Sequence, residues 1–196
     1  MPAAKRVPRC PTKITAFMPA KIRWRRYLMW PRLFAAIALL VGGSLSPAMA
    51  ASPQLMGTFG DWKVYAVEGS NTRDCYVQAV PKVRSPDGLR RDPGSMFVTH
   101  HAGRAAMPEI AVSLGFPLRT GSSHSLQIGG RSFMVYGKGE NGWPQNDGDQ
   151  GRIVELMKAG QQLTIVTLTG RGNRNVDTFS LTGFTKAWDL ASRNCR

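Results

Sequence analysis

The sequence predicts a mainly β protein, an antiparallel β-sandwich that carries one or two short helices. Three observations point to this fold class. Apolar residues alternate with polar ones in about eight short segments, which is typical of half-buried strands. Two segments in the C-terminal third instead space their apolar residues as a helix does. The long crossover connections that a parallel sheet needs are missing from the pattern, which argues against a doubly wound α/β fold.

The alternation is clearest in residues 61–67, where Trp62, Val64 and Ala66 fall on one face of the segment. The other segments with this pattern, rich in β-branched and aromatic residues, are 75–80, 96–100, 109–116, 124–128, 132–136, 162–168 and 176–181. The adjacent glycines Gly129 and Gly130 separate two of these segments. Because both glycines can adopt positive φ, they predict a tight hairpin turn.

The first helical segment spans residues 149–162, where Ile153, Leu156 and Met157 recur at helical spacing. Asp149 is the predicted N-cap, and Gly160 is placed to end the helix. The second helical segment spans residues 182–195. Its apolar residues Phe184, Ala187, Trp188 and Ala191 follow the i, i+3, i+4, i+7 pattern of an amphipathic helix. The stretch 81–95 is rich in proline, glycine and charge, and predicts a loop.

The first fifty residues have the pattern of a secretory signal peptide. Residues 1–32 hold nine lysines and arginines and no acidic residue, and the apolar run 33–43 follows. Small residues at Ala48 and Ala50 form an A-x-A-like cleavage site. The apolar run is shorter than the roughly 20 residues that a membrane-spanning helix needs. We therefore expect cleavage after Ala50, a single domain over residues 51–196, and a periplasmic or secreted protein. An uncleaved membrane anchor is the alternative.

The leader also decides how the charge is interpreted. The whole chain has a formal net charge of +14, which by itself would favour a nucleic-acid-binding protein. Nine of the 26 basic residues belong to the leader, so the remainder carries 17 basic and 12 acidic residues. Because this mild excess of basic over acidic residues is spread along the chain, we expect no nucleic-acid partner.

Two cysteines, Cys75 and Cys195, lie after the leader. An even number of cysteines in an exported chain indicates a disulfide, and two cysteines allow one intramolecular pairing. Such a bond would hold the end of the second predicted helix against an early strand, where a chain end otherwise frays. Free or intermolecular thiols are the alternative.

Catalytic and metal-binding patterns are weak. His100 and His101 are adjacent on a predicted strand and point to opposite faces, and with His124 they show no metal-ligand spacing. Asp147 and Asp149 are two nearby carboxylates, but helix capping explains Asp149 better than glycosidase chemistry does. The sequence therefore predicts no metal, no cofactor and no legible catalytic mechanism. A hydrolase of envelope polymers that uses these groups is the alternative.

The most suggestive polar stretch is 169–175. Its residues Arg171, Gly172, Asn173 and Arg174 combine two guanidiniums with glycine geometry. Backbone amides and guanidiniums together can bind an anion, so this stretch is a candidate loop for a small anion or a partner. A plain connection between two strands is the alternative.

The tryptophans Trp62 and Trp188 are expected to pack in the core. Trp143 and Pro144, with Tyr136 and nearby glycines, form a candidate exposed aromatic patch for a partner.

Seven stretches, in order along residues 57–190, resemble the invasion-associated locus B family of exported proteobacterial proteins, and in particular a divergent alphaproteobacterial branch of it. They are GDWKVY, CYVQAVPK, RDPGSMFVTH, SLGFPLRTGSS, LQIGGRSFMVYG, IVELMKAGQQL and TGRGNRNVDTFSLTGF. The chain departs from better-known members at Ala66, where they carry a cysteine, and it has none of their mid-chain cysteines.

The resemblance implies an immunoglobulin-like β-sandwich and an envelope protein whose founding relatives are associated with host-cell invasion. It supplies no catalytic residues. We therefore expect an exported binding or structural protein that meets a protein or glycan partner, in the envelope or on a host cell.

Overall fold

The computed structural model describes residues 52–69, 72–103 and 107–195. The predicted signal peptide, residues 1–50, lies outside these ranges, and the cleavage site stays a prediction. Within the described ranges, no helix is both long enough and apolar enough to cross a membrane.

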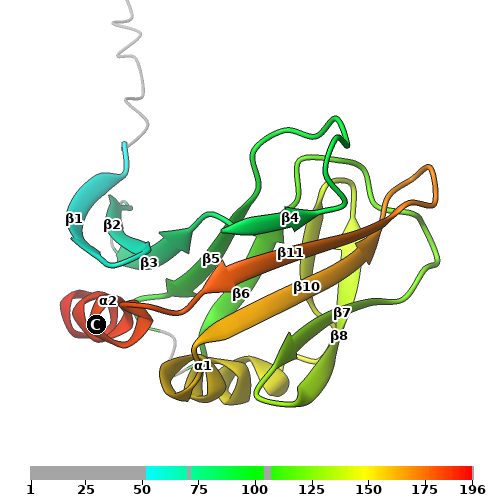
Figure 1. Cartoon of the computed structure of the whole chain (residues 1–196). Coiled ribbons are helices and arrows are strands. Elements are labelled where there is room, and N and C mark those ends of the chain that lie inside the picture. The colour runs from blue at the N-terminus through cyan, green and yellow to red at the C-terminus, as the bar shows by residue number, and fades with distance from the viewer. Residues whose placement is uncertain (1–51, 70–71, 104–106, 196) are drawn as a thin grey trace, which may run out of the picture. The chain divides into compact units, whose positions relative to one another are not determined.

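Eleven strands and two helices make up the described part of the chain (Figure 1). The strands are β1 (Gln54–Phe59), β2 (Trp62–Glu68), β3 (Arg73–Ala79), β4 (Val83–Ser85), β5 (Ser95–His100), β6 (Glu109–Ser113), β7 (His124–Ile128), β8 (Arg131–Lys138), β9 (Asn141–Pro144), β10 (Gln162–Leu168) and β11 (Arg174–Ser180). The helices are α1 (Asp149–Ala159) and α2 (Phe184–Asn194).

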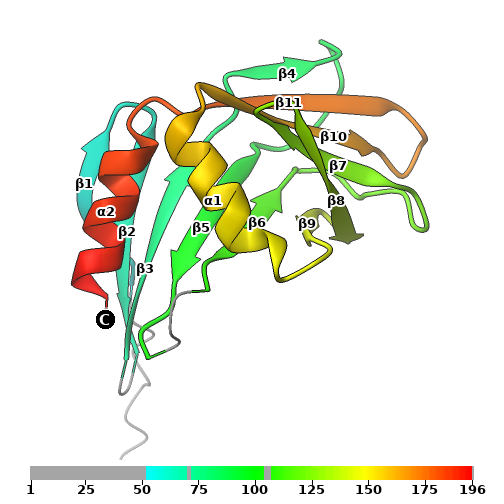
Figure 2. The ribbon, with the colours of Figure 1, turned by 90° about the horizontal axis from the view of Figure 1, so that it is seen from below.

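The strands form one continuous sheet in the order β1-β2-β3-β5-β6-β9-β8-β7-β10-β11-β4. Each strand pair in it is antiparallel. Figure 2 shows that the sheet bends, so that β2, β3, β5 and β6 form one wall and β7, β10 and β11 form the other. The predicted mainly β, sandwich-like fold with one or two helices is confirmed: the described residues form two helices and more strands than the eight expected.

The core lies between the two walls. Alternate residues of each central strand point inward and are buried, as Trp62, Val64 and Ala66 are on β2. Helix α2 covers β1, β2 and β3 with the four residues that the helical spacing singled out. Its Phe184 ring meets Trp62 edge to face, with 4.9 Å between ring centroids, and Trp188 is also buried.

Cys75 and Cys195 form the predicted disulfide, which joins β3 to the residue after α2. Their Cα atoms lie 5.6 Å apart, and 120 residues separate them in the sequence. Both cysteines are buried, so the bond is part of the packed layer between α2 and the sheet.

Helix α1 lies across the opening between the two walls at one end of the sheet (Figure 2). It buries Ile153, Val154 and Met157 there. The predicted N-cap Asp149 is wrong: Gly148 holds the cap position, no side chain caps the helix, and Asp149 is its first residue. A negative charge in the first turn still suits the helix dipole. Gly160 ends the helix as expected, and its N–H donates to the Leu156 carbonyl.

Two turn predictions have different outcomes. Gly129 and Gly130 join β7 to β8 with φ of 55° and 73°, which confirms the tight hairpin. The stretch 81–95, predicted as a loop, contains the short edge strand β4, paired with β11. Three residues beside prolines are too few to show an alternation, and Arg84 on this strand is held mainly by the carboxylate of Asp177, 93 positions away, rather than by local preference.

Candidate functional site at the loop end

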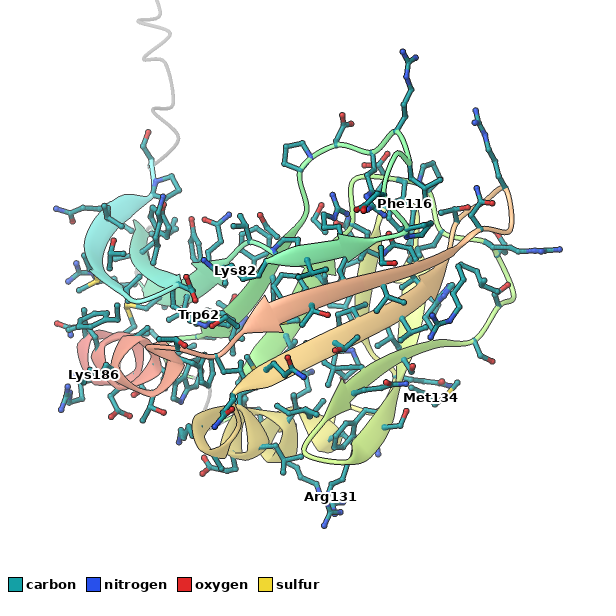
Figure 3. The ribbon with its side chains drawn as sticks, in the orientation of Figure 1. Trp62, Lys82, Phe116, Arg131, Met134 and Lys186 are labelled. Carbon is teal, nitrogen blue, oxygen red and sulfur yellow. A yellow bond between two sulfur atoms is a disulfide. The ribbon has the colours of Figure 1, made fainter. Side chains whose placement is uncertain are left out.

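Three loops meet at the end of the sheet away from α1 (Figure 1). They are 86–94 between β4 and β5, 114–123 between β6 and β7, and 169–173 between β10 and β11. We call this region the loop end. Figure 3 shows Phe116 at the loop end and Arg131, in the β7–β8 hairpin, at the opposite end of the sheet.

Backbone hydrogen bonds hold these loops to one another. The Gly170 N–H donates to the Pro117 carbonyl at 2.7 Å, and the Arg119 N–H donates to the Leu168 carbonyl at 2.9 Å. The Asp92 N–H donates to the Gly115 carbonyl at 2.9 Å. The three loops are therefore positioned by hydrogen bonds between them and to the end of β10.

A buried ion pair fixes the base of the loop end. Asp177 on β11 is fully buried, and Arg84 on β4 holds its carboxylate with two hydrogen bonds, Nε to Oδ1 at 3.0 Å and Nη2 to Oδ2 at 3.1 Å. Arg84 also donates to the carbonyls of Asp92 (2.8 Å) and Leu114 (2.6 Å). One guanidinium thus joins β4, β11 and two of the three loops, in the paired geometry that a buried charge requires.

A second arginine fixes loop 86–94. The Arg91 Nη1 atom donates to Oδ1 of the buried Asn175, and its Nη2 atom donates to the Pro86 carbonyl at 3.0 Å. Asn175 in turn donates to the hydroxyl of the buried Thr167 at 3.5 Å. Arg91 therefore faces the loop end with its position determined by the sheet below it.

His124, at the start of β7, joins loop 114–123 to the end of β10. Its side chain is buried, and its Nδ1 atom accepts a hydrogen bond from the Leu168 N–H at 3.3 Å. Burial lowers the pKa of His124, and a backbone hydrogen bond with Arg119 opposes this only in part. A ring that accepts at Nδ1 is neutral, because imidazolium has no acceptor. His124 is therefore a packed, neutral histidine.

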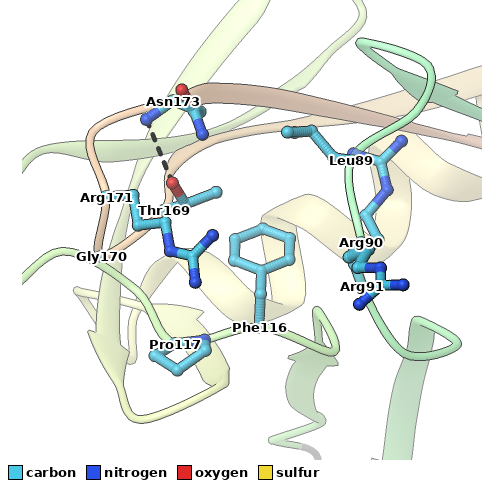
Figure 4. A pocket seen from close by; sticks show the side chains of 9 residues that line it. All are labelled: Leu89, Arg90, Arg91, Phe116, Pro117, Thr169, Gly170, Arg171 and Asn173. Atoms are coloured by element: carbon cyan, nitrogen blue, oxygen red, sulfur yellow. Dashed lines mark hydrogen bonds between the residues drawn. The ribbon is translucent and has the colours of Figure 1, made fainter.

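A pocket of about 340 Å³ opens between the three loops (Figure 4). Its walls come from loop 86–94, loop 114–123 and loop 169–173. The lining residues are Leu89, Arg90, Arg91, Phe116, Pro117, Thr169, Gly170, Arg171 and Asn173. Figure 4 shows the Phe116 ring between the Arg171 side chain and the Leu89–Arg91 segment. The pocket therefore combines three guanidiniums with one face of a largely buried phenyl ring, since Phe116 is only 7% exposed.

Two of these guanidiniums are uncommitted. Arg90 and Arg171 are exposed, and within residues 52–69, 72–103 and 107–195 neither makes a side-chain hydrogen bond or an ion pair. The three loops together carry four arginines and two aspartates. The loop end is thus locally positive on a domain of only mild net charge, an arrangement that attracts an anion.

Only two of the four residues predicted as an anion- or partner-binding loop line this pocket. Arg171 and Asn173 line the pocket, whereas Gly172 and Arg174 lie in the same turn and at the start of β11 without lining it. The N–H groups of Gly170, Gly172 and Asn173 already donate to Pro117 and Thr169. Affinity for an anion would therefore come from the guanidiniums more than from these amides.

Arg90, Arg91 and Phe116 were not singled out from the sequence. Two adjacent arginines in a proline- and glycine-rich loop were a signal for the first two, because such loops carry binding residues on rigid scaffolds. Phe116 continues an apolar run after β6 and has no such signal.

The histidine pair behaves differently from a catalytic pair. His100 packs beside Trp188, with 6.0 Å between ring centroids. His101 lies between two carboxylates, with Nδ1 3.0 Å from Asp74 and Nε2 3.0 Å from Glu109. Burial lowers the pKa of His101, but the hydrogen bonds and charges of Asp74 and Glu109 outweigh it, so the pKa is raised. Both ring nitrogens of His101 are therefore already within hydrogen-bonding distance of a carboxylate.

The remaining candidates are accounted for as follows. Tyr136 and Trp143 form a cross-strand pair on β8 and β9, with 6.5 Å between ring centroids. Tyr136 is exposed, whereas Pro144 is buried. Asp147 accepts a hydrogen bond from Gln150 at the start of α1. Among the residues that the structure describes, no cluster of histidine, cysteine and carboxylate groups could hold a metal ion.

The chain matches no protein-family model, and no curated protein sequence matches it. A solved structure does match its fold. The chain is similar in fold to invasion associated protein B from Bartonella henselae. The match covers 72% of this chain and 98% of that one, with a TM-score of 0.53 and 15% sequence identity. At this identity the similarity establishes the fold relationship that the sequence resemblance implies, and no shared activity.

Proposed function

We propose that this chain is an exported binding protein of the cell envelope, and that it meets a protein or glycan partner through its loop end. The observation that carries the proposal is the pocket between three loops, whose positions are fixed from below by Arg84 and Arg91. Binding residues on loops that a rigid scaffold holds in place lose little freedom when a partner arrives, so more of the contact energy appears as affinity.

Two further observations support export, and a third widens the search for the partner. The leader has the basic, apolar and small-residue parts of a signal peptide. The Cys75–Cys195 disulfide is of the kind that persists in oxidising compartments. The name of the fold neighbour refers to invasion, which adds the surface of a host cell as a second place to seek the partner.

Site-specific photo-crosslinking tests whether the loop end is the partner surface. A photo-reactive amino acid replaces Thr120, an exposed residue of loop 114–123, and in a matched variant it replaces Lys186, an exposed residue of α2. Figure 3 shows Lys186 on α2, far from Phe116. The full-length precursor is expressed in the native cells, and crosslinks are resolved by mass spectrometry.

We expect a discrete crosslinked species from the Thr120 variant and none from the Lys186 variant. A species from Lys186 alone, or equal yields from both positions, would place the partner elsewhere and refute the proposal. The same samples report the mass of the mature chain, and a retained leader would refute the proposed export.

A further inference from the structure

We propose that the loop-end pocket binds an organic acid: a carboxylate or phosphate monoester held by Arg90 and Arg171, with its attached planar apolar group against Phe116. This inference rests on the proposed function and specifies the chemistry of the partner group. It would apply equally to a free metabolite and to an acidic group on a larger partner.

The charge of the occupant follows from the state of the arginines. The Arg84 guanidinium donates hydrogen bonds to Asp177 and to two carbonyls, and the Arg91 guanidinium donates two, to Asn175 and Pro86. Arg90 and Arg171 have no such partner among the described residues, yet they line the same pocket. Guanidinium forks match the geometry of carboxylate and phosphate, and each presents five donors.

The organic part follows from the other walls. Phe116, Pro117 and Leu89 supply apolar lining beside the guanidiniums. A bare inorganic ion would leave the exposed Pro117, the half-buried Leu89 and the accessible edge of the largely buried Phe116 against water. A ring attached to the acid would cover this surface and gain hydrophobic stabilisation. A pocket of about 340 Å³ is near the lower limit for small-molecule sites. It therefore suits one ring with one acidic group.

The rigidity of the pocket supports the same conclusion. Arg91 is tied to the buried Asn175, and the loop that carries Arg171 is tied to Pro117 through the Gly170 N–H. The two loops are therefore held on opposite sides of Phe116 before any ligand binds. Groups that are held in place before binding lose little freedom when a ligand arrives, so more of the contact energy appears as affinity.

Titration of the mature, disulfide-bonded protein followed by amide NMR tests the proposal. Four probes are compared: benzoate, phenyl phosphate, inorganic phosphate and benzyl alcohol. We expect saturable shifts of the amides in 89–91, 116–119 and 169–173 with benzoate or phenyl phosphate, at least tenfold tighter than with inorganic phosphate or benzyl alcohol. The tighter of the first two identifies the acid as carboxylate or phosphate.

Two charge-matched variants complete the test. The Arg90→Gln/Arg171→Gln variant should bind the acidic probe at least tenfold more weakly, and the Arg131→Gln/Lys186→Gln variant should bind it as the wild type does. All four positions are exposed, and the unliganded amide spectra check that both variants are folded. Phe116→Leu should weaken phenyl phosphate and leave inorganic phosphate unchanged.

Absence of saturable shifts, or equal weakening in both charge variants, would overturn the proposal. Equal affinity for phenyl phosphate and inorganic phosphate would overturn the organic part, and equal affinity for benzyl alcohol would overturn the acidic part. A Thr120 crosslink without probe binding would refute this inference alone. Probe binding without a Thr120 crosslink would refute the proposed function alone.

Discussion

All three nitrogens of the Arg84 guanidinium donate hydrogen bonds, and their acceptors come from three parts of the chain: β11, loop 86–94 and the residue that follows β6. The residue sits on a three-residue edge strand that would be marginal alone. Its role is therefore to position the loop end, and its charge is compensated by Asp177 rather than offered to a ligand.

We expect Arg84→Met to destabilise the protein by about 3–5 kcal/mol, because it leaves the buried Asp177 carboxylate unpaired. Urea denaturation followed by tryptophan fluorescence measures the change. Arg84→Met/Asp177→Leu should recover much of the loss, since no buried charge remains without its partner. The control Arg90→Met, at an exposed and uncommitted arginine, should change stability by less than about 0.5 kcal/mol. An equal loss in Arg84→Met and Arg90→Met would contradict the assigned roles.

His124 makes the stability depend on pH. Its pKa is lowered in the folded state, so below its unfolded value of 6.5 the unfolded chain binds more protons. The stability it contributes is complete above that pH and falls on acidification, by at most about 1.4 kcal/mol per pH unit. The raised pKa of His101 stabilises the folded state below pH 6.5, and this contribution is lost only as the pH rises above 6.5. A change in stability between pH 5 and pH 6.5 is therefore assigned to His124.

Urea denaturation midpoints of the wild type and of His124→Asn, measured at several pH values, test this prediction. The Oδ1 atom of the asparagine can replace Nδ1 of His124 as the hydrogen-bond acceptor. The wild type should lose stability from pH 6.5 to pH 5, and the variant should show a smaller slope. Parallel slopes in the two proteins would show that His124 is not the titrating group.

At the scale of elements, the junction between the β1–β2 turn and α2 depends on close backbone approach. Gly183, just before α2, has a φ of 89°, and a Cβ atom there would lie 2.0 Å from the Phe59 carbonyl oxygen. Only glycine both adopts this positive φ without strain and has no Cβ atom to collide with the carbonyl. The same contact sets the position of α2 over the sheet and so the reach of Cys195 toward Cys75.

We expect Gly183→Ala to destabilise by more than about 2 kcal/mol, through strained φ and the displaced helix. The matched change Gly151→Ala, inside α1 and with nothing within 4 Å of the added Cβ, should stabilise by about 0.5–1 kcal/mol. Thermal denaturation of both variants measures the difference. Similar shifts of the same sign would refute the close-approach argument.

Local patterns predicted most elements because each could be judged within its own segment. Helix α2 was predicted with its four buried residues, since amphipathic spacing is a local property. Strand β4 was missed because its pairing with β11 and the bonds of Arg84 depend on residues about 90 positions away. The order of the eleven strands in the sheet could not be predicted for the same reason. Alternation shows which face of a strand is buried, but it does not show which strands pair with one another.

At the scale of the whole molecule, the disulfide connects the first wall of the sheet to the end of the chain. Cys75→Ser and Cys195→Ser should destabilise alike, by up to roughly 4–5 kcal/mol in the chain-entropy model for a loop of this length. The double variant should lose no more than either single variant, because each removes the same bond. Denaturant titration of the three variants measures this, and additive losses would contradict it.

The candidate site could be predicted only in part from the sequence. Arg171 and Asn173 drew attention through a polar, glycine-containing turn, and they line the pocket. Arg90 precedes Arg171 by 81 positions in the chain, and Phe116 precedes it by 55. The folded sheet brings the three loops that carry these residues to the same end. A site made by convergence of distant loops leaves no spacing in the sequence.

The central claim is that the uncommitted arginines of the loop end carry partner binding. It is tested most directly by the Kd of the partner that is crosslinked at Thr120, measured for the wild type, Arg90→Gln/Arg171→Gln and Arg131→Gln/Lys186→Gln by titration calorimetry. We predict at least tenfold weaker binding in the first variant and an unchanged Kd in the second, which removes the same charge elsewhere. Equal weakening in both variants would show that overall charge binds the partner and would contradict the account.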